Sequence, residues 1–298
     1  MIRALFLLAG AVVLAGCGTS RADEGTPPPR ESLPQARSQA AIPSGPAQIE
    51  LAGELTQGGW IRGIVPQGTV GLTLDGAPVT VAEDGRFFAA FDRDAGQEAT
   101  LVARLADGRE ISRILTIAPR AWNIEHINVA RRPGGPTEAF LAIRRPELER
   151  IRAARAIRPA SDGWRQSFIW PAKGRISGRF GSQRVYRGEP GSYHSGLDIA
   201  TGGSGAPFVA PADGVVVLAA QEPFTLEGYL LIIDHGMGLT SAFLHCSVLA
   251  VREGERVTQG QYIGRIGATG RATGPHLHWG IMWNGARLDP LLFTGPMN

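Results

Sequence analysis

Short runs in which apolar and polar residues alternate begin at about residue 48 and continue to about residue 120. Leu101, Ala103 and Leu105, for example, share one face of such a run. Asp-Gly pairs, which favour tight hairpin turns, separate the runs at 75–76, 84–85 and 107–108. The pattern predicts a small β-sandwich domain, with strands at 79–81, 87–91, 100–105 and 111–117. A spacer role and a binding role are both compatible with it.

The pattern changes in residues 121–163, which are rich in arginine. Pro146 is predicted at the first position of a helix, where proline is tolerated, with Leu148, Ile151 and Arg152 on one side. We therefore expect a helical or irregular linker over this segment. A linker of this kind could cover a groove in the domain that follows, and the sequence leaves this open.

Apolar strands bounded by turns return from about Trp164. The predicted strands lie within residues 209–218, 229–236 and 251–264, and no further helix pattern follows. The 40 glycines of the chain also favour turns and β structure over long helices. The sequence thus predicts a mostly β protein, in which residues 164–298 form a β-rich domain after the β-sandwich of residues 48–120.

The first 16 residues have the pattern of a bacterial lipoprotein signal peptide. The apolar run from Ala4 to Leu14 follows a positive start and is too short for a bilayer, which needs about 20 apolar residues. Leu14-Ala-Gly-Cys17 resembles a lipobox, which implies acylation of the Cys17 thiol; a plain secretory signal with a chance cysteine is the alternative. Residues 17–47 are rich in Pro, Ser, Arg and Gly, so we expect a disordered tether.

Composition restricts the partners of the protein. The 298 residues carry a net charge of +3, and pairs such as Arg131-Arg132 are too small for a nucleic-acid footprint, so we expect no nucleic-acid partner. The two cysteines are Cys17 and Cys246. If Cys17 is acylated, no intramolecular disulfide can form, and Cys246 is expected to be a small buried residue in a strand. A catalytic thiol beside His245 is the alternative, although neighbours in a strand face opposite sides.

Five of the six histidines lie beyond residue 190, and their spacing suggests a metal site. His194 and Asp198 are four residues apart in a glycine-rich, extended segment, so both side chains can point into one groove. His276 and His278 are two residues apart, which places both imidazoles on one side of a strand and directs Leu277 into the core. Two imidazoles and one carboxylate are a common ligand set of catalytic zinc, which leaves a fourth position for water.

These motifs resemble those of the lysostaphin-type (LytM-like) zinc metalloendopeptidases. The resemblance covers about residues 170–290 and rests on the following segments: His194-x-x-x-Asp198, Ala242-Phe-Leu-His245, Gly274-Pro275-His276-Leu-His278, and the glycine turns at Gly181, Gly214, Gly236 and Gly264. It implies a β-sheet or barrel-sandwich peptidase domain that binds one Zn²⁺. The family often has Tyr-Ala-His-Leu where this chain has Phe243-Leu244-His245-Cys246, and we expect the missing hydroxyl to tune the groove and not to abolish catalysis.

The resemblance also implies a role for each motif residue. His194, Asp198 and His278 correspond to the zinc ligands, and His245 and His276 correspond to a catalytic pair. Zinc would lower the pKa of its bound water to about 7 and polarise the scissile carbonyl. The histidine pair would orient that water and transfer its proton.

Other residues of the same region are weaker candidates. Arg179, Phe180 and Tyr193 are expected either to line the groove or to be ordinary surface residues. His235 matches the family framework as a structural turn residue, and His126 in the linker is expected to be exposed or locally satisfied.

The implied function is a zinc metalloendopeptidase that cleaves peptide cross-links of bacterial peptidoglycan, with stem peptides as its substrate. A lipobox without Asp after Cys17 implies a lipid anchor on the periplasmic face of the outer membrane, and this habitat suggests a D-Ala–diaminopimelate bond. Three alternatives stay open: a non-enzymatic activator of cell-wall amidases from the same family, a carboxypeptidase with the same site, and a structural wall-anchoring lipoprotein. The sequence does not determine the oligomeric state.

Overall fold

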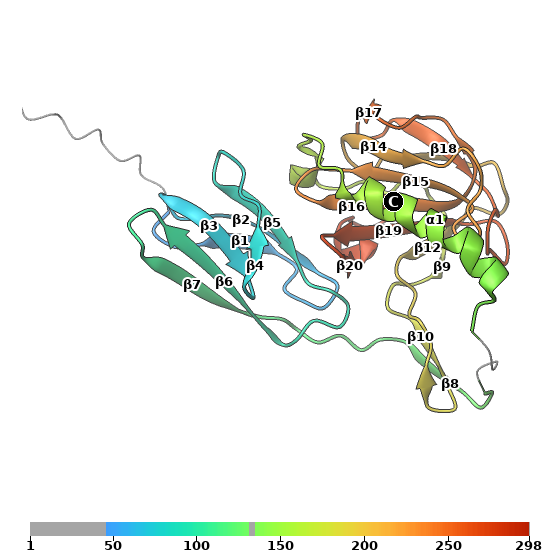
Figure 1. Ribbon diagram of the computed structural model, residues 1–298, viewed down its shortest axis with the longest axis horizontal. Coiled ribbons are helices and arrows are strands. Elements are labelled where there is room, and N and C mark those ends of the chain that lie inside the picture. Colours follow the sequence, from blue (N-terminus) through green and yellow to red (C-terminus); the bar gives the residue numbers. More distant parts are fainter. Residues whose placement is uncertain (1–45, 131–134, 298) are drawn as a thin grey trace, which may run out of the picture. The chain divides into compact units, whose positions relative to one another are not determined.

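The computed structural model describes residues 46–130 and 135–297, and the fold is mostly β, as predicted (Figure 1). The expected signal peptide, Cys17 and nearly all of the expected tether lie outside these residues. Within the described ranges, no helix is both long and apolar enough to cross a bilayer.

Two small sheets form the N-terminal part of the described chain. One has the strand order β1-β2-β5 and the other has the order β4-β3-β6-β7. Their strands are β1 (Glu50–Gly53), β2 (Trp60–Ile64), β3 (Thr69–Leu74), β4 (Ala77–Val79), β5 (Arg86–Ala90), β6 (Glu98–Leu105) and β7 (Glu110–Thr116). Leu101, Ala103 and Leu105 are all buried, which confirms the predicted alternation of β6. The Asp-Gly pairs at 75–76 and 107–108 stand in the β3–β4 and β6–β7 hairpins.

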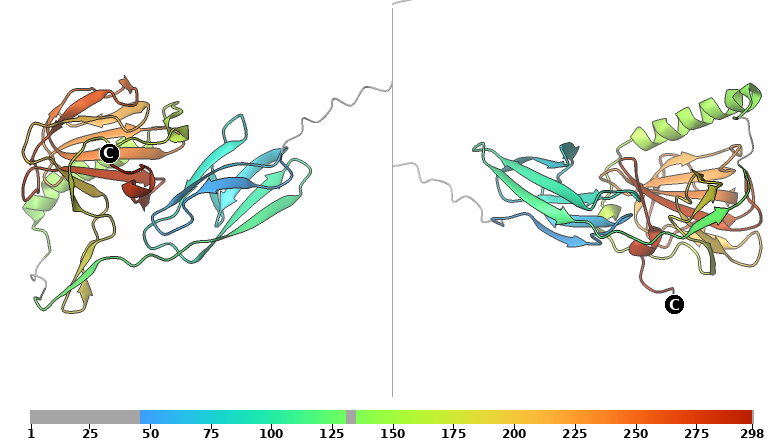
Figure 2. Two further views of the ribbon diagram at one scale, coloured as in Figure 1. Left: turned by 180° about the vertical axis from the view of Figure 1, so that it is seen from behind. Right: turned by 90° about the horizontal axis from the view of Figure 1, so that it is seen from below.

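A ten-stranded sheet forms most of the C-terminal part (Figure 2). The main path of the sheet has the order β17-β14-β15-β16-β19-β12-β9. Three strands lie off this path: β18 pairs with both β13 and β16, and β20 pairs with β19. Its strands are β9 (Arg175–Gly178), β12 (Leu197–Ala200), β13 (Pro207–Val209), β14 (Gly214–Ala219), β15 (Tyr229–Asp234), β16 (Leu239–Leu249), β17 (Arg256–Val257), β18 (Tyr262–Ile266), β19 (Leu277–Trp283) and β20 (Ala286–Leu288). The long apolar runs become the buried central strands β14, β15 and β16.

A third, small sheet combines the segment before the helix with a later hairpin. Its order is β11-β10-β8, and the β8–β10 pair is parallel. Its strands are β8 (Ile124–Ile127), β10 (Gln183–Tyr186) and β11 (Glu189–Pro190), and two short 3₁₀ helices complete the structure, η1 (Gly163–Arg165) and η2 (Pro290–Leu292). The expected linker therefore contributes β8, which pairs with β10.

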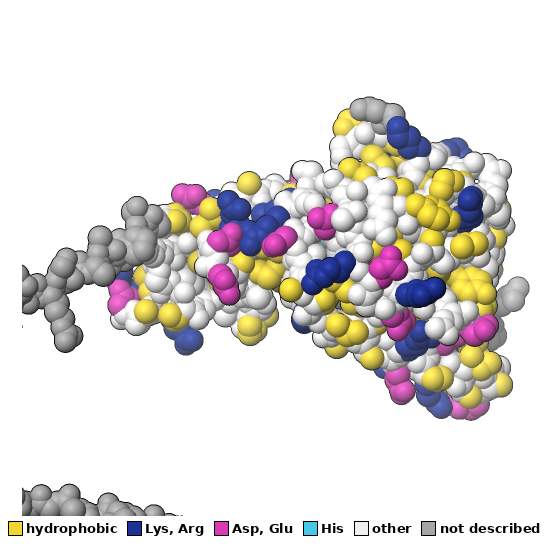
Figure 3. Space-filling model, turned by 90° about the horizontal axis from the view of Figure 1, so that it is seen from above, with side chains coloured by type: hydrophobic (Ala, Val, Ile, Leu, Met, Phe, Trp, Pro, Cys, Tyr) yellow, Lys and Arg dark blue, Asp and Glu magenta, His cyan; other side chains and the backbone are white. Residues whose placement is uncertain are grey.

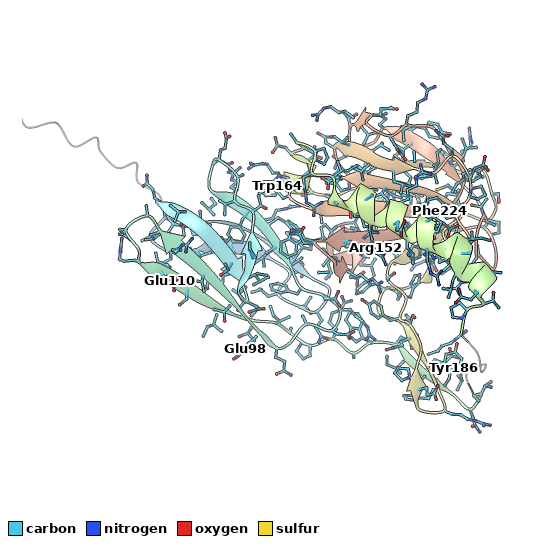
Figure 4. All side chains as sticks on the ribbon, in the orientation of Figure 1. Glu98, Glu110, Arg152, Trp164, Tyr186 and Phe224 are labelled. Atoms are coloured by element: carbon cyan, nitrogen blue, oxygen red, sulfur yellow. The ribbon has the colours of Figure 1, made fainter. Side chains whose placement is uncertain are left out.

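One long helix, α1 (Glu138–Ala156), lies along one face of the large sheet (Figures 1 and 2). Its N-terminus is capped by the side chain of Thr137, which accepts a hydrogen bond from the N–H of Phe140. The prediction that Pro146 occupies the first helical position is wrong, because the helix begins eight residues earlier and Pro146 lies inside it. Arg152 is exposed and does not share the inner face with Ile151 (Figure 4).

Candidate functional site

Strand pairing in the large sheet brings distant parts of the chain to one point. β12 pairs with β19 so that Asp198 lies opposite His278. On its other side β19 pairs with β16, and His278 lies opposite Leu244, the residue before His245. Three neighbouring strands thus carry three of the polar side chains that the sequence singled out.

His194 enters the site from the segment before β12, not from a strand. Its N–H donates to the carbonyl of Ser182 at 2.8 Å, and its own carbonyl accepts from the N–H of Gly181 at 2.9 Å. Gly181 has a φ of +81°, a conformation that glycine adopts at low cost. The backbone around Gly181 therefore sets the position of His194.

His194, Asp198 and His278 converge as the motif spacing predicts. The Nε2 atom of His194 and the Nδ1 atom of His278 lie 3.0 and 2.9 Å from the same oxygen, Oδ1 of Asp198. The two nitrogens are 3.0 Å from each other. Each of the three residues thus offers one potential ligand atom to a single point, an arrangement that could hold a metal ion.

The geometry of this group fits a zinc-sized ion. Zinc–ligand bonds of about 2.0–2.2 Å at tetrahedral angles place neighbouring ligand atoms roughly 3.3–3.6 Å apart, so small movements of the side chains would bring the observed separations of 2.9–3.0 Å to these values. The Nδ1–H of His194 donates to the carbonyl of Arg179 at 3.0 Å, which leaves the lone pair on Nε2, the atom that faces Asp198. The donor set of two nitrogens and one carboxylate is also typical of catalytic zinc.

The charge states of the group follow from its hydrogen bonds. Burial alone would raise the pKa of Asp198, but the contacts of its Oδ1 with the imidazole nitrogens of His194 and His278 outweigh burial and hold the pKa well below its usual range. Burial acts to lower the pKa of His194, but the Asp198 carboxylate outweighs it and raises that pKa. Burial lowers the pKa of His278, so its neutral form is favoured. An ionised carboxylate and neutral imidazoles are the forms that bind metals.

Two glycines make room for the ligand side chains. A Cβ atom at Gly178 would lie 2.3 Å from Oδ2 of Asp198, and one at Gly196 would lie 2.6 Å from Nε2 of His278. Real Cβ atoms essentially never lie this close to another heavy atom. Both positions therefore require glycine for a steric reason that the sequence analysis did not identify.

His245 and His276 lie beside this group and have the same tautomer. The Nδ1–H of His245 donates to the carbonyl of Thr269 and that of His276 donates to the carbonyl of Gly274, both at 2.8 Å. Their ring centroids are 4.9 Å apart, and Nε2 of His276 lies 3.7 Å from Oδ1 of Asp198. Because each Nδ1 carries the proton of the neutral ring, each Nε2 keeps a lone pair for proton transfer.

The backbone of His245 departs from regular strand geometry. Its φ is +64°, an uncommon value for a residue with a side chain, and the register between β16 and β18 shifts just after it. Its N–H donates to the carbonyl of Glu227 at 2.8 Å. This irregularity presents the His245 ring to the site while the following residue, Cys246, remains fully buried.

Two open pockets meet at this cluster. The larger, of about 1110 Å³, extends from His194 and Asp198 along β10 to residues 123–130, and the smaller, of about 380 Å³, contains all four histidines. Arg271 lines both pockets and was not singled out from the sequence. Its position in a glycine-bounded loop, five residues before His276, is the sequence feature that could have identified it as a residue near the site.

The weaker candidates for groove residues, Arg179, Phe180 and Tyr193, do not all line a pocket. Arg179 and Tyr193 line the larger pocket, and Tyr193 also lines the smaller one. Phe180 is buried against Trp122 and lines neither pocket. Phe243 is fully buried against Phe208, so the expectation that its missing hydroxyl tunes the groove is wrong.

The remaining histidines and Cys246 have structural roles. His235 is buried, its Nδ1–H donates to the carbonyl of Asp213, and its Nε2 accepts from the hydroxyl of Ser241, both at 2.8 Å. His126 is exposed in β8, as expected. Burial raises the pKa of the Cys246 thiol to about 12, which is incompatible with a nucleophilic thiolate near neutral pH.

An arginine from the β5–β6 connection supports the segment that holds His194. Arg93 is buried, and its Nη2 donates to the carbonyl of Gly181 at 3.1 Å and to Oε1 of Gln183 at 3.0 Å. Its guanidinium also lies over the ring of Tyr193, 4.7 Å from the centroid. A residue far upstream in the sequence thus contacts the wall of the larger pocket.

The region that contains this site is similar in sequence to known proteins. The sequence profile of peptidase family M23 matches residues 192–290. The chain is 36% identical over 136 residues, or 44% of its length, to the peptidoglycan DD-endopeptidase ShyA of Vibrio cholerae. It is 40% identical over 137 residues, or 45% of its length, to the lipoprotein NlpD/LppB homolog of Pseudomonas aeruginosa. Other relatives are named murein hydrolase activator NlpD.

These matches cover 30% and 41% of the first two relatives, so the chain spans less than half the length of each. A crystal structure from Pseudomonas aeruginosa, assigned to peptidase M23, resembles a larger part of the chain. It covers 80% of this chain and 95% of its own, with a TM-score of 0.60 and 29% identity. The profile match and the structural similarity confirm the resemblance inferred from the histidine motifs: residues 192–290 of this chain match peptidase family M23.

Proposed function

We propose that this protein is a zinc-dependent endopeptidase that cleaves peptide cross-links in bacterial peptidoglycan. The observation that carries the proposal is the convergence of His194, Asp198 and His278 on one point, with His245 and His276 beside it. The group lies where two open pockets meet, so an extended peptide can pass through it.

In this proposal the three convergent residues hold one Zn²⁺. The ion would supply Lewis acidity to the scissile carbonyl and lower the pKa of a bound water to about 7. Asp198 keeps the negative charge that attracts the cation, because the pKa of its carboxyl is held well below neutral pH. The carbonyl of Arg179 keeps the His194 ring in the orientation that aims Nε2 at the ion.

In this proposal the two other histidines transfer protons. With Nδ1–H held by Thr269 and Gly274, the Nε2 atoms of His245 and His276 can accept a proton from the attacking water and return it to the leaving amine. Burial lowers the pKa of His245, so its ring is a neutral acceptor at neutral pH. Acid–base help of this kind contributes about 10²–10⁴-fold to the rate.

The substrate bond is proposed from the comparisons and not from residue geometry. ShyA is named a DD-endopeptidase, and the matching region of this chain includes the complete histidine and aspartate set. We therefore propose the D-Ala–diaminopimelate bond of stem-peptide cross-links as the bond that is cut. Arg179 and Arg271 line the larger pocket and supply positive charge for the carboxylates of such peptides.

The proposal places the protein in the cell envelope. Cleavage before Cys17 and acylation of its thiol would anchor the chain in the outer membrane, facing the periplasm, and residues 17–47 would serve as a tether. We further propose that residues 48–120, 121–163 and 164–298 act as β-sandwich, linker and peptidase domains. The lipoprotein name of one relative supports this anchoring.

A non-enzymatic activator of cell-wall amidases is the second candidate. It is favoured by the relatives named murein hydrolase activator NlpD. Against it, an activator that works only through protein contacts has no need of three ligand atoms within 3.0 Å of one another.

Incubation of the mature protein with purified sacculi distinguishes the two candidates. The endopeptidase is expected to release peptides with cleaved cross-links, detected by mass spectrometry, and to lose this activity when zinc is chelated. Intact cross-links together with stimulation of an added amidase would refute the endopeptidase in favour of the activator.

A further inference from the structure

Helix α1 carries an arginine that forms a buried ion-pair network with the peptidase region. Nη1 and Nη2 of Arg144 each donate to one carboxylate oxygen of Glu227, both at 2.6 Å. Nη1 also donates to Glu147, one turn along the helix, at 2.9 Å. The three side chains are only 10%, 16% and 11% exposed, which is unusual for charged groups.

The network extends to the loop before β15. Both oxygens of Glu147 accept hydrogen bonds from Thr225, one from its N–H at 2.7 Å and one from its hydroxyl at 2.6 Å. Two helix residues, Arg144 and Glu147, therefore hold two positions of the loop, Thr225 and Glu227. Because the arginine contact is bidentate, it restricts the direction of the Glu227 side chain as well as its distance.

The loop that contains Thr225 and Glu227 is in direct contact with β16, the strand that carries His245. The carbonyl of Glu227 accepts the N–H of His245 at 2.8 Å, and this is the residue whose φ is +64°. Leu226 and Glu227 also line the smaller pocket, which contains the four histidines. A continuous chain of hydrogen bonds thus runs from the helix to the backbone of His245.

The helix itself does not enter the site. Its inner face packs on the sheet through Ile151 and Ala154, in a cluster that includes Phe224, the residue before Thr225 (Figure 4). Among the described residues that line the two pockets, none belongs to α1. Helix α1 therefore does not line the groove, whereas residues 123–130 of the same linker line its larger pocket.

We propose that Arg144 is a positioning residue, which holds the loop around Glu227 so that the backbone of His245 keeps its left-handed conformation. This inference rests on the proposed function, because it assigns the fixed position of His245 to catalysis. The helix α1 then has a definite role in the site, because it fixes the position of the loop that contacts His245.

Physical reasons favour a positioning task over a contribution to stability alone. An isolated pair of buried charges gains little net stability, since the loss of hydration offsets the attraction. A bidentate guanidinium contact instead specifies geometry, and a lysine, which is a point charge, cannot reproduce it. A non-glycine residue in the left-handed region also needs surrounding structure to keep it there.

Amide hydrogen exchange of the full chain tests the proposal without relying on activity. Arg144→Met is expected to speed exchange of the His245 N–H by about tenfold or more, through local opening of the loop. Arg144→Lys should give an intermediate rate. Arg145→Met is the matched control, because Arg145 is the next residue of the same helix and pairs with Glu138 on the surface. The amides of Leu231 and Ile233 in β15 should stay protected in all variants.

Kinetics and zinc affinity complete the test. If the wild-type protein cleaves cross-links, Arg144→Met should lower kcat by about tenfold, equivalent to 1.4 kcal/mol, with KM and zinc affinity nearly unchanged. Absence of cleavage by the wild type would contradict the proposed function, whereas an unchanged exchange rate at His245 would overturn the positioning role. A general rise in exchange that includes β15 would also overturn it, since that result indicates a merely structural role.

A second variant keeps the test decisive if Arg144→Met does not fold. The double variant Arg144→Met with Glu227→Gln removes both charges of the bidentate pair and leaves no uncompensated carboxylate at position 227. The proposal requires faster exchange of the His245 N–H in this variant as well. Wild-type exchange there would show that the ion pair does not position His245.

Discussion

The Nε2 atom of His194 and the Nδ1 atom of His278 lie 3.0 Å apart, although 84 residues separate them in the chain. Both also lie within 3.0 Å of one oxygen of Asp198. Two imidazole nitrogens facing each other at this distance repel unless a proton or a cation lies between them. The relationship is therefore the strongest sign that this site is built for a cation.

Removal of one nitrogen donor should abolish tight metal binding. His278→Ala is expected to weaken zinc affinity by more than about 100-fold, since even the loss of an outer-shell partner costs 10–100-fold, and to remove cleavage activity. Metal content after dialysis, measured by elemental analysis, is the readout. His126→Ala, at an exposed position in β8, is the control. Stoichiometric zinc in His278→Ala would contradict the ligand assignment.

Replacement of a catalytic histidine should separate rate from metal binding. His276→Gln keeps polarity but lacks a basic ring nitrogen, so kcat is expected to fall by about 10²–10⁴-fold. Zinc content should stay at the wild-type level, because the proposed ligand atoms belong to His194, Asp198 and His278. Undiminished cleavage of sacculi by His276→Gln would show that this ring transfers no proton.

Gly196 offers a steric test of the ligand arrangement. Gly196→Ala would place a methyl group 2.6 Å from Nε2 of His278 and from the carbonyl of Trp279, so the ring must move. We expect lower zinc affinity and a lower melting temperature. Gly203→Ala is the matched control in the following loop, where no atom lies within 4 Å of the added methyl group. Equal zinc affinities of the two variants would argue against tight packing at the ligand.

A buried carboxyl outside the site predicts a pH dependence of stability. Burial raises the pKa of Asp234 to about 6, while Oδ1 accepts the N–H of Gly236 and Oδ2 has no hydrogen-bond partner among residues 46–130 and 135–297. Since the folded state binds the proton more tightly, its contribution is fully present below the unfolded pKa near 4. The contribution is lost as the pH rises through about 6.

Asp234→Asn tests this dependence directly. At pH 7.5 the variant is expected to be more stable than the wild type by about 2–3 kcal/mol, because it avoids a buried unpaired charge. Below pH 4 the difference should disappear. Urea unfolding at several pH values measures it, and a stability difference that does not change with pH would show that this carboxyl titrates normally.

The catalytic-thiol alternative also makes a measurable prediction. Cys246 is fully buried and its thiol pKa is raised to about 12, so we expect no reaction with a thiol reagent in the folded protein. Cys246→Ala should keep its cleavage rate and lose about 1 kcal/mol of stability from the small cavity. Inactivation by a thiol reagent under native conditions would revive the thiol alternative.

Much of the fold was predictable because its signals are local. Hairpin turns need Asp-Gly pairs, and a strand with one buried face must alternate, as β6 does. The helix start was predicted wrongly because Pro146 was taken as its first residue, whereas the cap at Thr137 begins the helix earlier. Pro146 lacks the N–H for one hydrogen bond of the helix, and its neighbours Arg144 and Glu147 are held by contacts outside the helix.

The candidate ligands were predictable for a related reason. Two residues of each motif are close in sequence, and chain geometry alone brings their side chains to one side, as with His276 and His278. Gly196 and the contact between Arg144 and Glu227 were missed, since their partners lie in other strands and loops. Arg271, which lines both pockets, was missed as well.

Local pattern determined the mostly β class, the hairpins and the identity of the chemical groups, because these depend on neighbours along the chain. Tertiary structure decided how those groups meet: the register between β12 and β19 sets Asp198 opposite His278, and the irregular backbone at His245 turns its ring into the pocket. Strand register depends on the packing of many residues far apart in sequence, so no short motif contains it.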